Sequence, residues 1–299
     1  MGRSVYVASV EGYTGKSAVA LGVLDALSRR VERVGVYRPI VRRDGASYHS
    51  GRDYVLEMLT SHEAVQLSYE DCVGVTYDEV HADPTSALDT IVERYHRVAD
   101  RCDAVVVVGS DYTDVGTPTE FSYNARIAAN LGSPVLLVLN GSGRSADDLH
   151  TIADMAVAEL AANHGTLFAI VANRVSADDV AADIDALSRD GVPCYAIPEQ
   201  ALLSAPSLGD LMAVADGRLV SGDESLLARE ATGIVVAAMT MPHVLDRLFE
   251  GAVVITPGDR PEVVLGVLMA HVSTGFPQVS GIVLNGGFDL PPQVTKLLE

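Results

Sequence analysis

The chain has 299 residues, with 21 lysines and arginines against 40 aspartates and glutamates, and its formal net charge is −19. A hydrophobic fraction of 48% with 20% charged residues is ordinary for a soluble protein with a core. The negative charge repels phosphate backbones and acidic lipid surfaces, which argues against nucleic acid and membrane partners. A small anionic ligand remains compatible with it, because local N–H groups or one lysine outweigh a distant field.

The three cysteines, Cys72, Cys102 and Cys194, are far apart in the sequence and form no CxxC pair. An odd number of isolated cysteines is typical of reduced thiols in the cytoplasm. No apolar run approaches the roughly 20 residues that span a bilayer, and the first residues lack the pattern of a signal peptide. We therefore expect a soluble, cytoplasmic protein.

Short apolar runs alternate with helical patterns through the first 200 residues. A strand at residues 5–8 is followed by a helix at 18–27 and by a strand at 34–37 that ends at Arg38-Pro39. Four helix–strand pairs come next, with helices at 87–98, 125–131, 149–160 and 181–187 and strands at 104–108, 135–139, 167–172 and 193–197. Continuously apolar strands separated by helices predict an α/β fold, with a mostly parallel sheet covered by helices.

The pattern pauses at residues 198–206, which contain two prolines, and then restarts. Strands at 234–238, 252–255 and 281–284 alternate with helices at 242–249 and 263–271, which predicts a compact βαβαβ unit. Residues 291–299 begin like another helix, since proline suits a helix start. We expect domains at residues 1–200 and 207–289, with 290–299 as the start of a linker or helix.

The strongest motif reads Gly-Tyr-Thr-Gly-Lys-Ser at residues 12–17, between the first strand and the first helix. Glycines let consecutive N–H groups point at one phosphate, and the helix N-terminus adds positive potential. Lys16 can reach the β- and γ-phosphates of a nucleotide, and the hydroxyl of Ser17 can bind Mg²⁺. Val10 stands at the first glycine position of the P-loop consensus, so the alternative is a loop that keeps the shape without a ligand. The candidate cofactor is ATP with Mg²⁺, bound through Gly12, Thr14, Gly15, Lys16 and Ser17.

Three further polar residues follow or lie near strand ends. Asp111 follows the strand at 104–108 and is a candidate Mg²⁺ ligand, although it could equally start a turn or cap a helix. Asp53 is a second candidate ligand, and it could instead start a helix at 54–59. Asn173 can read the edge of a base through its amide, or can stand in a left-handed turn. The sequence contains no HExxH pair and no G-x-S-x-G serine, so no catalytic residue is assigned.

Several motifs occur in one order along the chain. They are the loop at 12–17, Val-Gly-Val-Tyr-Arg-Pro at 34–39, Thr-Pro-Thr-Glu-Phe-Ser-Tyr-Asn at 117–124, Asn-Arg-Val at 173–175, Thr-Pro-Gly-Asp-Arg-Pro at 256–261 and Asn-Gly-Gly at 285–287. Together they resemble the N-terminal half of the long form of phosphate acetyltransferase, which has a dethiobiotin-synthetase-like P-loop domain followed by a DRTGG domain. The likeness covers essentially all 299 residues.

The resemblance implies a parent enzyme that interconverts acetyl-CoA plus phosphate with acetyl phosphate plus CoA. In that family the chemistry lies in a further C-terminal acyltransferase domain, which we expect to lie beyond residue 299. The N-terminal region is expected to form a homo-oligomer and to respond to a small-molecule effector or nucleotide.

Three positions depart from or match the synthetase relatives. Those relatives have Lys-Pro where this chain has Arg38-Pro39, and a metal-binding Glu where this chain has Val108. Asp53 falls where they keep an Asp near the metal. Two alternatives therefore stay open, namely a free-standing ATP-dependent ligase resembling dethiobiotin synthetase and a purely structural module with a vestigial loop.

Overall fold

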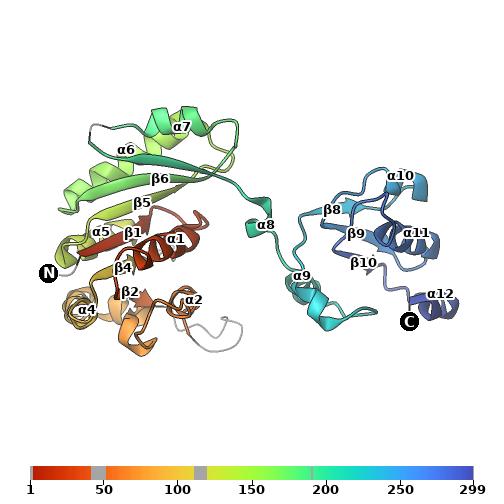
Figure 1. The fold of residues 1–299 in the computed structure, drawn as a ribbon, viewed down its shortest axis with the longest axis horizontal. Coiled ribbons are helices and arrows are strands. Elements are labelled where there is room, and N and C mark those ends of the chain that lie inside the picture. The colour runs from red at the N-terminus through yellow and green to blue at the C-terminus, as the bar shows by residue number, and fades with distance from the viewer. Residues whose placement is uncertain (1–2, 42–51, 111–119, 190, 299) are drawn as a thin grey trace. The chain divides into compact units, whose positions relative to one another are not determined.

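The computed structural model describes residues 3–41, 52–110, 120–189 and 191–298. The chain divides into two compact units, Met1–Glu199 and Gln200–Glu299 (Figure 1). Each has its own sheet. Among the residues with described positions, no helix combines the length and hydropathy that crossing a bilayer requires.

The first unit is built on seven strands in the order β3-β2-β4-β1-β5-β6-β7, and every neighbouring pair is parallel. The strands are β1 Arg3–Ser9, β2 Val34–Val41, β3 Val73–Thr76, β4 Ala104–Val108, β5 Val135–Asn140, β6 Leu167–Val175 and β7 Cys194–Pro198. The predicted parallel α/β fold is confirmed. Strand order reverses around β1, and in open α/β sheets the crevice at such a reversal is where ligands bind.

Two apolar layers cover the two faces of this sheet. Alternate residues of β4 belong to different layers, with Val105 and Val107 in one and Val106 and Val108 in the other. Helices α1 (Lys16–Ser28) and α2 (Tyr54–Thr60) pack on the face of Val106. Helices α4 (Pro84–Ala99), α5 (Glu120–Leu131), α6 (Ala146–Ala162) and α7 (Val180–Leu187) pack on the face of Val105. Such double coverage explains why the strands read as unbroken apolar runs.

Strand β2 differs from the expectation that it ends at Arg38-Pro39. It continues to Val41 and is buried throughout. Its first half pairs with β4 as far as Tyr37, whereas its second half pairs with β3. Pro39 has no N–H to donate, and it lies beyond the part of β2 that pairs with β4. The prolyl ring therefore does not end the strand.

The segment between β2 and α4 contains more structure than its composition predicts. Three elements here were not predicted from the sequence, namely β3, the 3₁₀ turn η1 (Glu70–Cys72) and helix α3 (Tyr77–Ala82). Strand β3 has only four residues, so no alternation develops along it, and its position at the sheet edge comes from pairing with β2.

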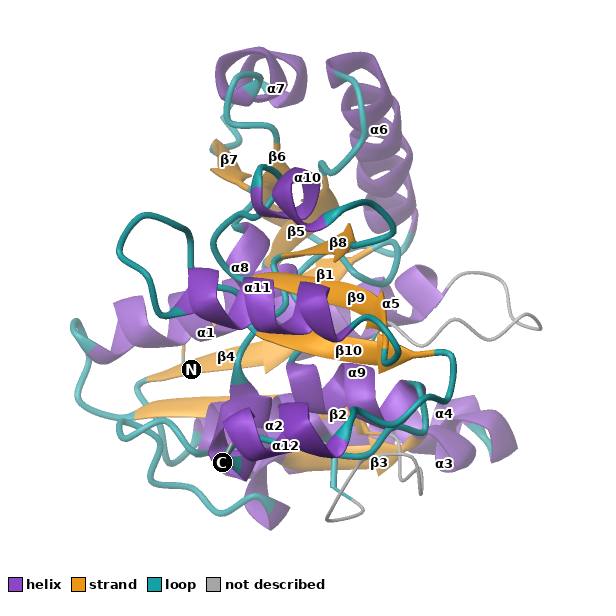
Figure 2. Cartoon of the chain, turned by 90° about the vertical axis from the view of Figure 1, so that its right-hand side faces the viewer, coloured by secondary structure: helices purple, strands orange, loops and turns teal. Residues whose placement is uncertain are grey.

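The second unit is the predicted βαβαβ arrangement, with parallel strands in the order β10-β9-β8 (Figure 2). Its strands are β8 Gly233–Val236, β9 Ala252–Pro257 and β10 Gly281–Asn285, and its crossover helices are α10 Met241–Leu245 and α11 Pro261–His271. Helix α10 is shorter than expected, because Arg247 and Leu248 donate to residues only three positions earlier. The remaining elements are α8 Ala201–Ser204, α9 Leu208–Val214, η2 Glu224–Ala228 and α12 Pro292–Leu298. Helix α12 matches the helix expected near residues 291–299.

Candidate P-loop site

The loop between β1 and α1 lies at the carboxyl end of the central strand. Gly15 precedes the helix with φ +75°, a left-handed conformation that glycine adopts without steric cost. Thr14 is buried, and its hydroxyl accepts a hydrogen bond from the Lys16 N–H at 3.3 Å. Helix α1 starts directly after this glycine, at Lys16. The N–H groups of its first turn and the positive end of its dipole thus lie at this edge of the sheet.

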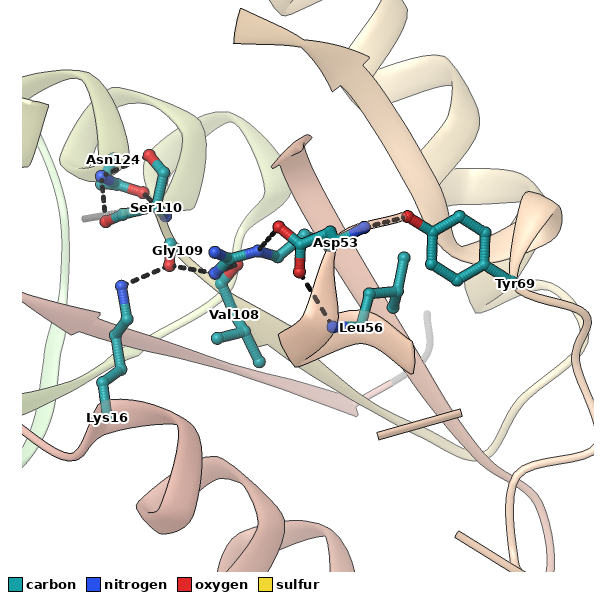
Figure 3. A network of polar contacts seen from close by, with 9 residues as sticks. Lys16, Asp53, Leu56, Tyr69, Val108, Gly109, Ser110 and Asn124 are labelled. Carbon is teal, nitrogen blue, oxygen red and sulfur yellow. Dashed lines mark hydrogen bonds and ion pairs between the residues drawn. The ribbon is translucent and has the colours of Figure 1, made fainter. Parts of the chain in front are cut away.

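The side chain of Lys16 runs inward from the first turn of α1 (Figure 3). It is only 2% exposed, and its Nζ donates to the carbonyl oxygen of Gly109 at 2.5 Å. Gly109 directly follows β4, the strand beside β1. Lys16 therefore connects the loop to the neighbouring strand end.

Arg38 reaches the same carbonyl oxygen from β2. Its Nη1 donates to Gly109 O at 2.6 Å and to Val108 O at 3.3 Å, and its Nε donates to Oδ2 of Asp53 at 3.3 Å. The arginine is 2% exposed, as deeply buried as Lys16. Two basic side chains from different elements thus meet at one main-chain oxygen. Arg38 was not predicted as a site residue from the sequence. The available signal was a charged residue directly after an apolar run, because a buried charge needs a polar or charged partner.

Asp53 caps helix α2 and faces Arg38. Its Oδ1 accepts from the N–H of Leu56 at 2.9 Å, the geometry of an N-cap, while its Oδ2 accepts from Arg38 (Figure 3). Its own N–H donates to the hydroxyl of Tyr69 at 2.8 Å. The side chain of Asp53 is 4% exposed, so a helix cap and a buried ion pair account for its position.

A buried amide fixes the main chain just after β4. Oδ1 of Asn124, on α5, accepts from the hydroxyl of Tyr6 at 2.6 Å and from the N–H of Ser110 at 3.1 Å, and its Nδ2 donates to Ser110 O at 3.3 Å. Burial raises the pKa of the Tyr6 hydroxyl, which keeps it protonated as a donor. A Cβ on Gly109 would lie 2.5 Å from Asn124 Oδ1, so only glycine fits there. This clamp aims the Gly109 carbonyl at Lys16 and Arg38.

The end of β6 supports the loop from its other side. Nδ2 of Asn173 donates to Thr14 O at 2.8 Å, and Nη1 of Arg174 donates to Tyr13 O at 3.0 Å. Arg174 has φ +63° and also donates to Glu199, with Nη2 at 2.7 Å and Nε at 3.0 Å. The amide expected to read a base therefore contacts the loop itself.

A bound Mg²⁺ needs several oxygen ligands in near-octahedral geometry. Val108 brings no oxygen from its side chain, and Asp53 is in contact with Arg38. Ser17 lies in the first turn of α1, whereas Asp111 lies outside the described residues. Across residues 3–41, 52–110, 120–189 and 191–298, no three or more His, Cys, Asp or Glu side chains are arranged to hold a metal ion. The described residues thus bring one hydroxyl, that of Ser17, and one carboxylate, that of Asp53, which is held by Arg38, and the Mg²⁺ ligands stay a prediction.

Comparison with known proteins identifies the first unit. Residues 3–207 match the AAA domain family. The chain belongs to this family. Residues 210–299 match the DRTGG domain, so the AAA domain is followed by the second domain that the sequence motifs indicate.

Curated relatives that match this chain are longer proteins. The chain is 29% identical to phosphate acetyltransferase of Nitratidesulfovibrio vulgaris and 30% identical to phosphate acetyltransferase of Synechocystis sp., with the whole chain matched in both. It spans 44% of the length of each relative and corresponds to their N-terminal part. The resemblance drawn from the sequence is thus confirmed.

Solved structures also resemble part of this chain. The septum site-determining protein MinD of Pyrococcus horikoshii, complexed with Mg-ADP, aligns with 68% of this chain and 84% of its own, at 18% identity and a TM-score of 0.41. An ATP complex of Cyanothece McdA aligns with 68% of this chain and 85% of its own, at 14% identity and the same TM-score.

Proposed function

We propose that this chain is the N-terminal regulatory region of a phosphate acetyltransferase, and that its P-loop site binds a nucleotide or a related anion. The whole enzyme would interconvert acetyl-CoA plus phosphate with acetyl phosphate plus CoA, with acyl transfer in a further domain. Two relatives with that name match the chain along its full length, which supports the assignment to this enzyme.

One observation carries the anion site, namely the meeting of Lys16 and Arg38 at the Gly109 carbonyl beside the N-terminus of α1. Buried ammonium and guanidinium groups favour an anionic partner, because charge-assisted hydrogen bonds to phosphate are stronger than those to a neutral carbonyl. The site lies at the reversal of strand order, the usual ligand crevice of this architecture. Gly12, Thr14, Gly15 and Ser17 complete the proposed site.

The proposed role is control of the acyltransferase through a ligand-dependent shift between states of a homo-oligomer. We place the protein in the cytoplasm, since its three cysteines are free thiols and two of them are buried. Light scattering of the chain with and without ATP measures the oligomer and its response. A monomer in both conditions would contradict the proposed mechanism of control.

Calorimetric titration of the 299-residue chain with ATP and MgCl₂ tests the anion site. Lys16 and Lys296 are the two lysines of the sequence, so Lys296→Ala is a matched control for Lys16→Ala. We expect Lys16→Ala to weaken binding about tenfold or more, and Lys296→Ala to leave it unchanged. Failure of the parent chain to bind ATP, ADP or pyrophosphate would remove the anion site from the proposal.

The ligase alternative predicts turnover of ATP, and an ATP-hydrolysis assay on the chain distinguishes it. Val108 stands where a strand-end carboxylate would hold the metal of such a ligase, so we expect no hydrolysis above that of the Lys16→Ala variant. Hydrolysis that depends on Lys16 and Mg²⁺ would favour the ligase.

A further inference from the structure

The guanidinium group of Arg38 occupies the strand end where a P-loop enzyme places the acidic ligands of its metal. Nη1 contacts the carbonyl oxygens of Val108 and Gly109, the last residue of β4 and the one after it. The same arginine contacts Asp53 through Nε. A fixed cation therefore lies at the strand end from which a carboxylate would hold the divalent cation.

We propose that Arg38 replaces Mg²⁺ in this site, so that the P-loop binds a polyphosphate anion without a divalent cation. The inference rests on the proposed anion site and specifies its ligand chemistry. In the common P-loop arrangement Mg²⁺ neutralises the β- and γ-phosphates. Here a planar guanidinium, which is always charged and matches phosphate oxygens in pairs, supplies that neutralisation.

The geometry makes an anion the fitting ligand and a divalent cation an unfavourable one. The Lys16 and Arg38 nitrogens that share Gly109 O lie at most about 5 Å apart. Both nitrogens are directed at one point, so a phosphate oxygen there would accept from an ammonium and a guanidinium group, whereas Mg²⁺ there would meet two donors and no acceptor. Both side chains are 2% exposed, so water and salt screen their charges little.

Asp53 holds the arginine in this position. Its two oxygens are directed by the Leu56 N–H on one side and by Arg38 Nε on the other. Tyr69 further fixes the main chain of Asp53 by accepting its N–H. A carboxylate that binds both a helix end and a guanidinium positions the guanidinium, and Asp53 is thus a positioning residue of the anion site.

Titration of the chain with ATP and with pyrophosphate, once in excess EDTA and once in MgCl₂, tests the proposal. We expect Kd values in the two conditions to agree within about threefold. A loss of about tenfold or more in EDTA would overturn the replacement of Mg²⁺ by Arg38, while the proposed anion site would stand. No binding in either condition would overturn the anion site itself, and the inference with it.

Variants of the ion pair show which residue is responsible. Arg38→Gln removes the cation that contacts the buried Asp53 carboxylate and can unfold the chain, so the double variant Arg38→Gln/Asp53→Asn removes both charges together. We expect the folded double variant to bind pyrophosphate in EDTA about tenfold or more weakly. Unchanged affinity would contradict the proposal.

Two further variants complete the design. Arg94→Gln is the matched control, because Arg94 is a partly buried arginine of α4 that also donates to a main-chain oxygen, that of Gly74. We expect it to leave both Kd values unchanged. Asp53→Asn keeps Arg38, so binding should remain independent of Mg²⁺. A selective loss of Mg-ATP binding in Asp53→Asn would identify Asp53 as a metal ligand and overturn the inference. Thermal unfolding of each variant confirms that it is folded.

Discussion

A Cβ atom on Gly15 would lie 2.2 Å from Nδ2 of Asn173, the atom that donates to Thr14 O. The loop and the end of β6 thus approach so closely that no side chain fits between them. The glycine is required both by this approach and by its φ of +75°.

Gly15→Ala should therefore destabilise the chain more than a glycine replacement that only strains the backbone. Gly143 has φ +70° and no atom within 4 Å of its Cβ position, which makes Gly143→Ala the control for strain alone. We expect about 1–2 kcal/mol from strain at either position, and about 1 kcal/mol more at Gly15 from the broken Asn173 hydrogen bond. Urea unfolding measures both. In an Asn173→Ala background, Gly15→Ala and Gly143→Ala should destabilise the chain equally. A larger loss of stability from Gly15→Ala in that background would contradict a role for the Asn173 hydrogen bond.

Asn173→Ala distinguishes support of the loop from recognition of a base. If Asn173 acts through Thr14, the variant should bind ATP and pyrophosphate more weakly by the same factor, about three- to tenfold. If it reads a base, only the ATP affinity should fall. Asn140 pairs with Asn173 in register at the end of β5 but binds the N–H of Ser142, so Asn140→Ala is the control and should change neither affinity.

Asn124→Ala should lower the free energy of unfolding by about 3 kcal/mol. The change leaves the Tyr6 hydroxyl and the Ser110 N–H buried without their acceptor, at about 1–3 kcal/mol each. Asn130, on the same helix but exposed, donates only to Arg126 O, and its replacement by Ala should stay within about 0.5 kcal/mol. Denaturant unfolding of the two variants checks the difference, and equal effects would mean that Asn124 is no clamp.

The stability of the chain should decline at alkaline pH, in part through Cys72. Burial, with a contribution from the Asp71 carboxylate, raises the pKa of this thiol from 9.0 to about 12. The unfolded chain ionises first, so the contribution is fully present below pH 9 and is lost as the pH rises from about 9 to about 12, by about 1.4 kcal/mol per pH unit.

Urea unfolding between pH 8 and about pH 10.5 measures this decline. We expect a shallower decline in Cys72→Ala than in the parent chain, and a smaller change of slope in Cys194→Ala, whose thiol is less buried. Slopes are compared because the cavity in Cys72→Ala lowers stability at every pH. Identical slopes in the parent chain and Cys72→Ala would contradict the prediction. Some decline remains in every variant, since burial also raises the pKa of Tyr6 and Tyr37.

The elements predicted from the sequence are those with a visible hydrophobic pattern within their own residues. The buried strand β4 and the amphipathic helix α4 were both anticipated, because burial on two faces or on one stripe leaves a visible period. Strand β3 was missed, because its four residues become a strand only through pairing with β2. The predicted end of β2 was wrong, since the effect of Pro39 depends on which neighbour each half of the strand has.

The candidate site was predictable in its loop and not in its surroundings. The pattern Gly-x-x-Gly-Lys-Ser at residues 12–17 indicates a phosphate-binding loop from the sequence alone. The contact between Arg38 and Asp53 joins residues on different elements, and the clamp of Tyr6 and Asn124 spans 118 positions. Neither pair has a spacing motif, so only the fold reveals them. Whether Asp111 contributes stays a prediction, to be measured as the Mg²⁺ dependence of ATP binding in Asp111→Asn.

The acceptor at which Lys16 and Arg38 meet belongs to the main chain. Replacing side chains one at a time can remove either donor, but no such scan removes the Gly109 oxygen. Its strength as an acceptor is set by the peptide bond to Ser110, so an ester in place of that amide would weaken it while keeping every side chain. The ester also removes the Ser110 N–H, which donates a hydrogen bond to Asn124. The effect of the ester is therefore compared with that of Asn124→Ala, which removes the same hydrogen bond. Chemical ligation, rather than conventional mutagenesis, is the route to the centre of this site.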